Sequence, residues 1–195
     1  MRFILSDESW MLDALSPSEW QLLRELPDIA SGRHYHPAAK DRLYPSPLAE
    51  EVIADESTLM QVEDWDELIR PELEEAFAQA RFAVEKDLKN CRLLSIEDFF
   101  EGDISDEEGA EEFEFDFPEL YRIEVPLEHT EFWYSTLNQA RLLMNEEYDI
   151  AGAEERFMAM SPGMPGYNEE RMLLIAQYEL FSVVQSILVE NVMGE

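Results

Sequence analysis

Positive charge is what this sequence has least of. Lys and Arg together number 14 against 45 Asp and Glu, which gives a formal net charge of −31 at pH 7. Nucleic acids and anionic membranes are bound mainly through Lys and Arg, which displace the counterions of the phosphates. We therefore expect neither direct nucleic-acid binding nor membrane binding, and we expect any protein partner to be more basic than this chain.

Cysteine is also scarce, since Cys91 is the only one in 195 residues. One cysteine excludes an internal disulfide and fits a reducing compartment. The first ten residues contain one Arg followed by acids where a signal peptide needs an apolar run. The most apolar stretch, residues 172–193, is interrupted by Gln177, Glu179 and Glu190, so we expect it not to span a membrane. These features together predict a cytoplasmic protein.

Helical patterns account for most of the chain. Ser16 and Glu19 flank Pro17 as in a capping box, which predicts a helix start there and a helix end at Pro27. A long helix should follow Pro71, which either opens it or kinks one begun near Asp64. Further helices are predicted over 127–148 and from Asn168 onward. The last helix is apolar on most sides, so it lies either in the centre of a bundle or at a homodimer interface.

Alternating residues predict a few short strands among these helices. Residues 3–5, 92–96 and 121–125 read as strands, and 113–117 alternates as cleanly between Phe and acidic residues. A loop over 31–47, a short helix near 48–54 and an irregular stretch over 152–166 complete the prediction. The expected fold is mostly α, a helical bundle-like single domain over 1–195 with a small antiparallel β element.

An acidic insert at about 97–119 is the best functional candidate in the sequence. All its charged residues are Asp or Glu, and phenylalanines lie among them. Acidic and aromatic residues in a mobile segment suit docking on a basic protein partner. The alternative is a solvated insert that ends in the strand at 113–117. The partner-binding candidates are Phe99, Phe100, Glu107, Glu108, Glu111 and Glu112.

A second candidate lies on the helix predicted over 127–148. Asn138 and Arg141 are three residues apart and share a helix face with Tyr134. An Arg set among apolar residues could bind an anionic ligand. The alternative is a structural Arg paired with one of the many carboxylates.

Catalytic and metal motifs are missing from the sequence. His34 and His36 supply two ligands where a metal site needs three or four. Glu128 and His129 are adjacent, so they cannot form the Glu-x-x-His pair of di-iron bundles. Neither a nucleophile motif nor a phosphate-binding loop is present, and Cys91, expected to be a small buried residue, has no identifiable base. We therefore predict no catalytic residue, no metal and no cofactor.

Two stretches resemble a known family. They are Trp65-Asp66-Glu67-Leu68 through Leu73, and Pro126-Leu127-Glu128-His129 through Leu142. Both are similar to an uncharacterised, mainly actinobacterial family, the domain of unknown function number twenty-seventeen. The resemblance extends loosely over residues 16–192 and implies no assigned activity. Genes of that family lie near an adaptor of the Clp protease, so the resemblance implies an adaptor or regulatory role.

Three functions follow from these observations. The first is a non-enzymatic interaction or regulatory protein that docks on a basic partner through the acidic insert. The second is a mimic of DNA charge that occupies a nucleic-acid-binding protein, whose binding would weaken steeply with salt. The third is a small-molecule or metal-dependent enzyme with a pocket near Arg141.

Overall fold

The computed structural model describes residues 1–45, 56–95, 98, 119–150 and 168–194. The strands are β1 (Arg2–Leu5), β2 (Ser9–Leu15), β3 (Arg92–Leu93) and β4 (Tyr121–Pro126). The α-helices are α1 (Pro17–Leu23), α2 (Leu26–Ser31), α3 (Pro37–Asp41), α4 (Glu56–Asp64), α5 (Arg70–Leu88), α6 (Thr130–Tyr148) and α8 (Glu169–Leu188). Shorter turns are η2 (Trp65–Ile69), η4 (Leu127–His129) and η5 (Val189–Met193). The predicted fold class, mostly helical with a small antiparallel sheet, is confirmed.

The four strands form one sheet in the order β1-β2-β4-β3, with every neighbouring pair antiparallel. β2 and β4 are the two inner strands, and the register between them shifts between Leu12 and Leu15. Ala14 has a φ of 53° at this shift, a left-handed conformation that is uncommon for a residue other than glycine. The bulge separates Leu12, which faces the helices, from the end of the strand.

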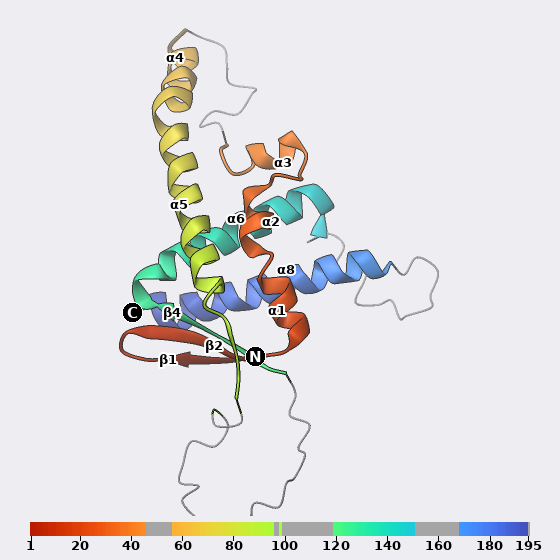
Figure 1. Ribbon diagram of the computed structural model, residues 1–195. Coiled ribbons are helices and arrows are strands. Elements are labelled where there is room, and N and C mark those ends of the chain that lie inside the picture. The colour runs from red at the N-terminus through yellow and green to blue at the C-terminus, as the bar shows by residue number, and fades with distance from the viewer. Residues whose placement is uncertain (46–55, 96–97, 99–118, 151–167, 195) are drawn as a thin grey trace, which may run out of the picture.

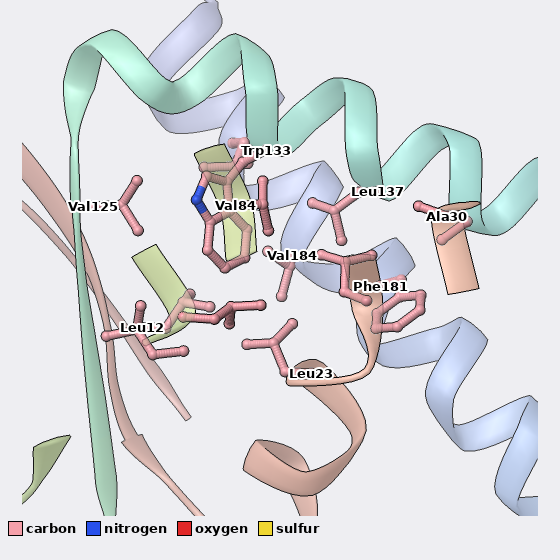
Figure 2. Close-up of a cluster of buried hydrophobic side chains, with 14 of the residues drawn as sticks. Leu12, Leu23, Ala30, Val84, Val125, Trp133, Leu137, Phe181 and Val184 are labelled. Carbon is pink, nitrogen blue, oxygen red and sulfur yellow. The ribbon is translucent and has the colours of Figure 1, made fainter. Parts of the chain in front are cut away.

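The sheet and helices share one hydrophobic core. Figure 2 shows Trp133 of α6 between Leu12 and Val125 of the sheet and Phe181 and Val184 of α8. All five side chains are fully buried. Deleting a side chain of this size from a packed core costs about 3–5 kcal/mol, so these contacts fix how α6 and α8 lie on the sheet.

Local signals at helix starts behave as the sequence predicts. Ser16 and Glu19 form the complete capping box of α1, with the Ser16 hydroxyl accepting from the Glu19 N–H at 3.2 Å. Asn168 caps α8 by accepting from the N–H of Arg171. Asp149 ends α6 in the left-handed conformation that closes many helices.

The long helix is longer than the sequence predicts. Figure 1 shows α4, η2 and α5 as one continuous rod, whose N-terminal end stands away from the body of the protein. Pro71 lies just inside α5 and lacks an N–H, and the π turn at Trp65–Ile69 immediately precedes it. Of the two readings of Pro71, the helix that starts before it is therefore the one observed.

Several element predictions were incomplete or wrong. The first helix does not run to Pro27 as predicted, because α1 ends at Leu23. Pro27 instead lies at the start of α2, where its missing N–H costs nothing. The stretch predicted as loop after Ser31 contains α3, which Pro37 opens. β2 was not predicted, because Asp13 and Ala14 break its apolar pattern. The elements expected near 48–54, 113–117 and 152–166 lie outside the described residues.

The last helix is a core element with one exposed side. α8 buries Ile175, Phe181 and Leu188 against the rest of the protein, while Leu173 and Val183 stay exposed. Glu169–Met193 is long enough and apolar enough to cross a membrane, with a mean hydropathy of 1.7 in its most apolar window. From the polar residues within this stretch, the sequence predicts the opposite. Core helices of soluble proteins meet the same criterion. A homodimer through the exposed side stays a prediction.

Candidate functional site

The exposed part of the α4–η2–α5 rod carries many acidic side chains. Residues 60–79 span the end of α4, η2 and the first half of α5, and none of them is buried. We call this stretch the acidic arm. The rod is buried in the core from Ala80 onward, at Ala80, Val84 and Leu88. Its exposed carboxylates are Glu63, Asp64, Asp66, Glu67, Glu72, Glu74 and Glu75.

The acidic arm also exposes apolar side chains. Met60 and Leu68 are 61% and 62% exposed, and Ile69 is 41% exposed. Arg70 is its one basic residue, and its guanidinium pairs with Asp66 at 3.6 Å and Glu74 at 3.2 Å. The arm therefore presents unneutralised negative charge beside apolar groups. Tertiary contact at its base comes from the segment after α3, where Tyr44 packs on Phe77 with ring centroids 5.7 Å apart.

A buried carboxylate and a histidine meet at the other end of the rod. Asp87, in the last turn of α5, is 2% exposed, and both its oxygens lie 3.0 Å from Nδ1 of His129. The indole Nε1 of Trp133 donates to the same carboxylate at 3.0 Å. Because an ionised carboxylate only accepts hydrogen bonds, Nδ1 of His129 is the donor in this contact, and Nε2 on the other side of the ring lies 3.9 Å from Oε1 of Glu128.

Asp87 and His129 line an open pocket of about 910 Å³. The pocket lies where the C-terminal end of α5 approaches the sheet and the start of α6. Its wall comes from the β1–β2 turn, the end of α5, β3, β4 and η4. All of its lining residues except Pro126 are polar or charged. A pocket of this size and character suits a small polar ligand.

A chain of alternating charges runs across the sheet beside this pocket. Asp13 is fully buried and accepts from Arg2 and from Arg122 Nε, the latter at 2.6 Å. Asp98 joins Arg122 to Arg92, at 3.3 and 2.7 Å. Burial disfavours the charge on Asp13, but the hydrogen bonds and charges of Arg122 and Arg2 outweigh it and lower the pKa of Asp13. Hydrogen bonds from Arg92 and from the Ser95 N–H hold the pKa of Asp98 well below its usual range.

The pocket does not assemble a serine nucleophile. Ser6 and Ser9 line it, but the Ser9 hydroxyl donates to Glu124 at 2.9 Å and the two serine hydroxyls lie 3.0 Å apart. Within the described part of the chain, neither serine is hydrogen-bonded to His129. A nucleophile and its base need that contact. The described residues of this pocket therefore do not form a serine–histidine pair.

The residues predicted to bind a partner through the insert cannot be placed. Phe99, Phe100, Glu107, Glu108, Glu111 and Glu112 all lie outside the described residues. Asp98 is described near the start of the insert, where Arg92 and Arg122 bind it.

The residues predicted to bind a ligand lie on α6 and have internal contacts. Arg141 donates to Gln185 Oε1 and to the Tyr178 hydroxyl, and its guanidinium lies 5.2 Å from the centre of the Tyr178 ring. Tyr134 and Asn138 are half-buried on the same helix. Arg141 thus joins α6 to α8. This is a structural role, as in the alternative given under Sequence analysis, but its partners are the neutral side chains of Gln185 and Tyr178 and not carboxylates. The pocket described here is lined by other residues.

The remaining candidates of the sequence have ordinary surroundings. His34 is exposed near Asp28, and His36 caps α3 by accepting from the Ala38 N–H at 3.3 Å. No group of three His, Cys, Asp or Glu side chains that could hold a metal occurs among the described residues. Cys91 is half-buried rather than buried, and burial raises the pKa of its thiol to about 11.

The Asp87–His129 pair was missed because the partners are 42 residues apart in the sequence. A signal for Asp87 existed. It follows Val84 by three residues and precedes Leu88 by one, so helical spacing places a carboxylate on the buried face of α5. A charged residue at such a position needs a partner, and His129 and Trp133 are the donors that satisfy it.

Comparisons with known proteins return no relative. No protein-family model matches the chain, and neither do any curated proteins or solved structures.

Proposed function

We propose that this protein is a non-enzymatic interaction or regulatory protein that docks on a more basic protein partner, and that the acidic arm is a docking surface. The observation that carries the proposal is the exposure of acidic and apolar side chains together on residues 60–79. The acidic insert at about 97–119 is a second docking element, supported by its sequence alone.

Charge selects the partner. Asp and Glu outnumber Lys and Arg by 45 to 14 in the chain, and the one Arg of the arm is already paired. Complementary charge speeds encounter and rejects acidic partners, while the apolar contacts supply affinity once the surfaces meet. A partner with Lys or Arg around an apolar stripe, such as a basic amphipathic helix, complements both features of the arm.

Exposed apolar residues separate this proposal from mimicry of DNA charge. A charge mimic needs carboxylates but gains nothing from Leu68 or Met60, which are among the most exposed apolar side chains described. Leu68→Ser leaves the charge unchanged and removes an apolar contact. Docking of the proposed kind weakens in this variant, whereas binding by charge mimicry does not.

The proposal is tested by capturing proteins from a lysate of the source cells. The arm variant carries Glu67→Gln, Glu72→Gln and Glu75→Gln, and the control variant carries Glu131→Gln, Glu146→Gln and Glu190→Gln, all at exposed positions. Both variants change the net charge equally. We expect a discrete basic protein to be retained by the wild type and the control and lost by the arm variant. Equal retention by all three proteins would show that the acidic arm takes no part in docking.

The insert has its own test. A chain lacking Glu97–Glu119 keeps the acidic arm, so retention of the same partner at reduced affinity makes the insert a second docking element. Unchanged affinity would show that the insert plays no part in docking.

A further inference from the structure

A second pocket, of about 410 Å³, lies where α2 packs beside α5 (Figure 1). It shares no lining residue with the larger pocket described above. Its wall comes from the residues between α1 and α2, from α2 and the turn after it, and from α5. Gly32 ends α2 in the left-handed conformation, with a φ of 61°, and a Cβ there would lie 3.2 Å from Leu143. This glycine turn brings Arg33 to the same opening as Arg24 and Arg81.

The three arginines of this pocket have no carboxylate partner among the described residues. They are three of the 14 basic residues of the chain, and none of them forms an ion pair within the part that the structure describes. Arg81 is half-buried and has neutral contacts, since it donates to the amide oxygen of Gln139 at 2.5 Å and interacts with the hydroxyl of Tyr44. Gln139 is 1% exposed, so it fixes the guanidinium without neutralising it. The pocket therefore holds positive charge that an anion from outside the chain can neutralise.

The two carboxylates of the lining have other neighbours. Glu85 pairs with Lys89 at 2.7 Å, and Asp28 lies 3.6 Å from Nε2 of His34. The hydrogen bond and charge of Lys89 lower the pKa of Glu85, and the charge of Arg33 adds to this effect. The lining itself carries three arginines against two carboxylates, which reverses the balance of the whole chain.

The same pocket has an exposed aromatic ring. Phe82 follows Arg81 on α5 and is 68% exposed, the highest value among the exposed large apolar side chains of the described residues. Ala80 and Val84, two positions away on either side, are buried, so Phe82 lies on the outward face of α5. An exposed aromatic ring beside arginines suits the stacking of a nucleotide base, because every base has a π face.

These features agree on the chemistry of a ligand. Three guanidinium groups match a group with several negative charges, and a diphosphate offers these charges together with acceptors for paired hydrogen bonds. The ring of Phe82 adds a contact that an inorganic anion cannot use. At 0.15 M salt, charges are screened beyond about 8 Å, so distant carboxylates oppose an anion only weakly while the arginines act in contact. The pocket volume lies within the range of about 300–1,000 Å³ that is usual for ligand sites.

We propose that this pocket binds a free nucleotide, with its phosphates paired with Arg24, Arg33 and Arg81 and its base stacked on Phe82. Gln139 is a positioning residue, because it acts on the ligand only through Arg81. The nucleotide is bound and is not changed chemically. This site is a function beyond docking on a basic partner, and it lies beside the acidic arm on α5.

The test is a titration of the full chain with ADP, in 0.15 M NaCl without divalent cations, followed through the backbone amide resonances by NMR. We expect the amides of Gly32, Arg33 and Phe82 to shift and to saturate together. Amides of β1, which lies outside the pocket, should stay in place. The absence of any shift at the pocket, or unsaturated shifts spread evenly over the protein, would overturn the proposal.

Two fragments of ADP test which groups the pocket recognises. Adenosine lacks the phosphates, and pyrophosphate lacks the base. We expect each to bind more weakly than ADP by about tenfold or more, since each loses one of the two kinds of contact. Pyrophosphate that binds as tightly as ADP would make this a general anion site and overturn the assignment to a nucleotide. Adenosine that binds as tightly as ADP would show that the arginines play no part, and would overturn it as well.

Exposed arginines provide a matched pair of variants. Arg33→Gln removes one charge at the pocket, and Arg42→Gln removes one from an exposed position outside it. We expect the first to weaken ADP binding by about fivefold or more, as loss of a hydrogen bond between charged groups does, and the second to leave it unchanged. Equal affinity of the two variants for ADP would overturn the proposal.

Phe82→Leu separates stacking from a structural effect, because it keeps an apolar side chain at this exposed position and removes the ring. We expect ADP binding to weaken by about fivefold or more and pyrophosphate binding to stay unchanged. Equal loss for both ligands, or no loss for ADP, would show that the base does not stack on Phe82 and would overturn the proposal. The substitutions of the arm variant leave all four contact residues in place, so failure of this proposal and failure of the docking function give different results.

Discussion

At the residue scale, the buried carboxylates are held by specific donors. Asp13 accepts from Arg2 and Arg122, and Asp87 accepts from His129 and Trp133. A buried charge without such partners would cost several kcal/mol. Among the acidic residues that the structure describes, Asp13 and Asp87 are the buried ones.

Replacing Asp13 by Asn should lower the free energy of unfolding at pH 7 by about 3 kcal/mol, because Arg122 then loses a buried partner but keeps Asp98. The folded-state pKa of Asp13 is below its ordinary value of 3.8, so its stabilising effect is complete above that value and is lost as the pH falls through the lowered pKa. Urea unfolding of both proteins should show the gap narrowing from pH 7 to pH 3. A gap that is constant or widens would contradict this account of Asp13.

Cys91 should be a poorly reactive thiol. Burial raises its pKa to about 11 from an ordinary 9.0, so its thiolate fraction at pH 8 is about 100-fold lower than that of a free thiol. Alkylation by iodoacetamide at pH 8, followed by mass spectrometry, should be slower than that of a small-molecule thiol by about this factor. A rate equal to that of the free thiol would show that Cys91 is not shielded as described.

How much the sequence predicts depends on the distance between the interacting residues. The Ser16–Glu19 box is local, and its residue types and spacing were enough to predict it. The Asp87–His129 contact joins α5 to η4, and only the fold brings these two residues together. Arg141 shows the reverse case, because a residue that looked available in sequence is engaged by Gln185 and Tyr178 of a later helix.

At the element scale, apolar periodicity predicted α5, α6 and α8 well, because each is a long helix with a regular buried face. β2 was missed because Asp13 and Ala14 break its apolar pattern, and the arginines that pair with Asp13 come from other strands. The exposed part of the rod was only partly foreseen. A helix without a buried face shows no apolar periodicity, so the sequence of residues 60–69 did not predict a helix there.

The capping box of α1 offers a test at this scale. Ser16→Ala removes the acceptor for the Glu19 N–H and should lower the free energy of unfolding by about 1 kcal/mol. Ser18→Ala, at an exposed position of the same helix, is the control and should stay within about 0.5 kcal/mol of the wild type. Chemical denaturation measures both. Equal losses would mean that the box does not stabilise α1.

At the scale of the whole molecule, the net charge of −31 opposes the compact state through self-repulsion. Ions screen this repulsion over about 10 Å at 0.1 M salt. Thermal unfolding at pH 7 should therefore move to higher temperature between 10 mM and 500 mM NaCl. A melting temperature that falls over this range would show that the internal ion pairs, such as Arg122–Asp98, outweigh the repulsion.

The same charge makes the acidic arm a docking surface in this account, and a defined probe tests that claim most directly. A fluorescent synthetic helix with leucines on one face and lysines on the other is titrated into the wild type, the arm variant and the control variant at 0.15 M NaCl. The account predicts binding that is about tenfold weaker in the arm variant, from three lost charges at about 0.5 kcal/mol each, and unchanged in the control. Equal affinity for the arm and control variants would contradict it.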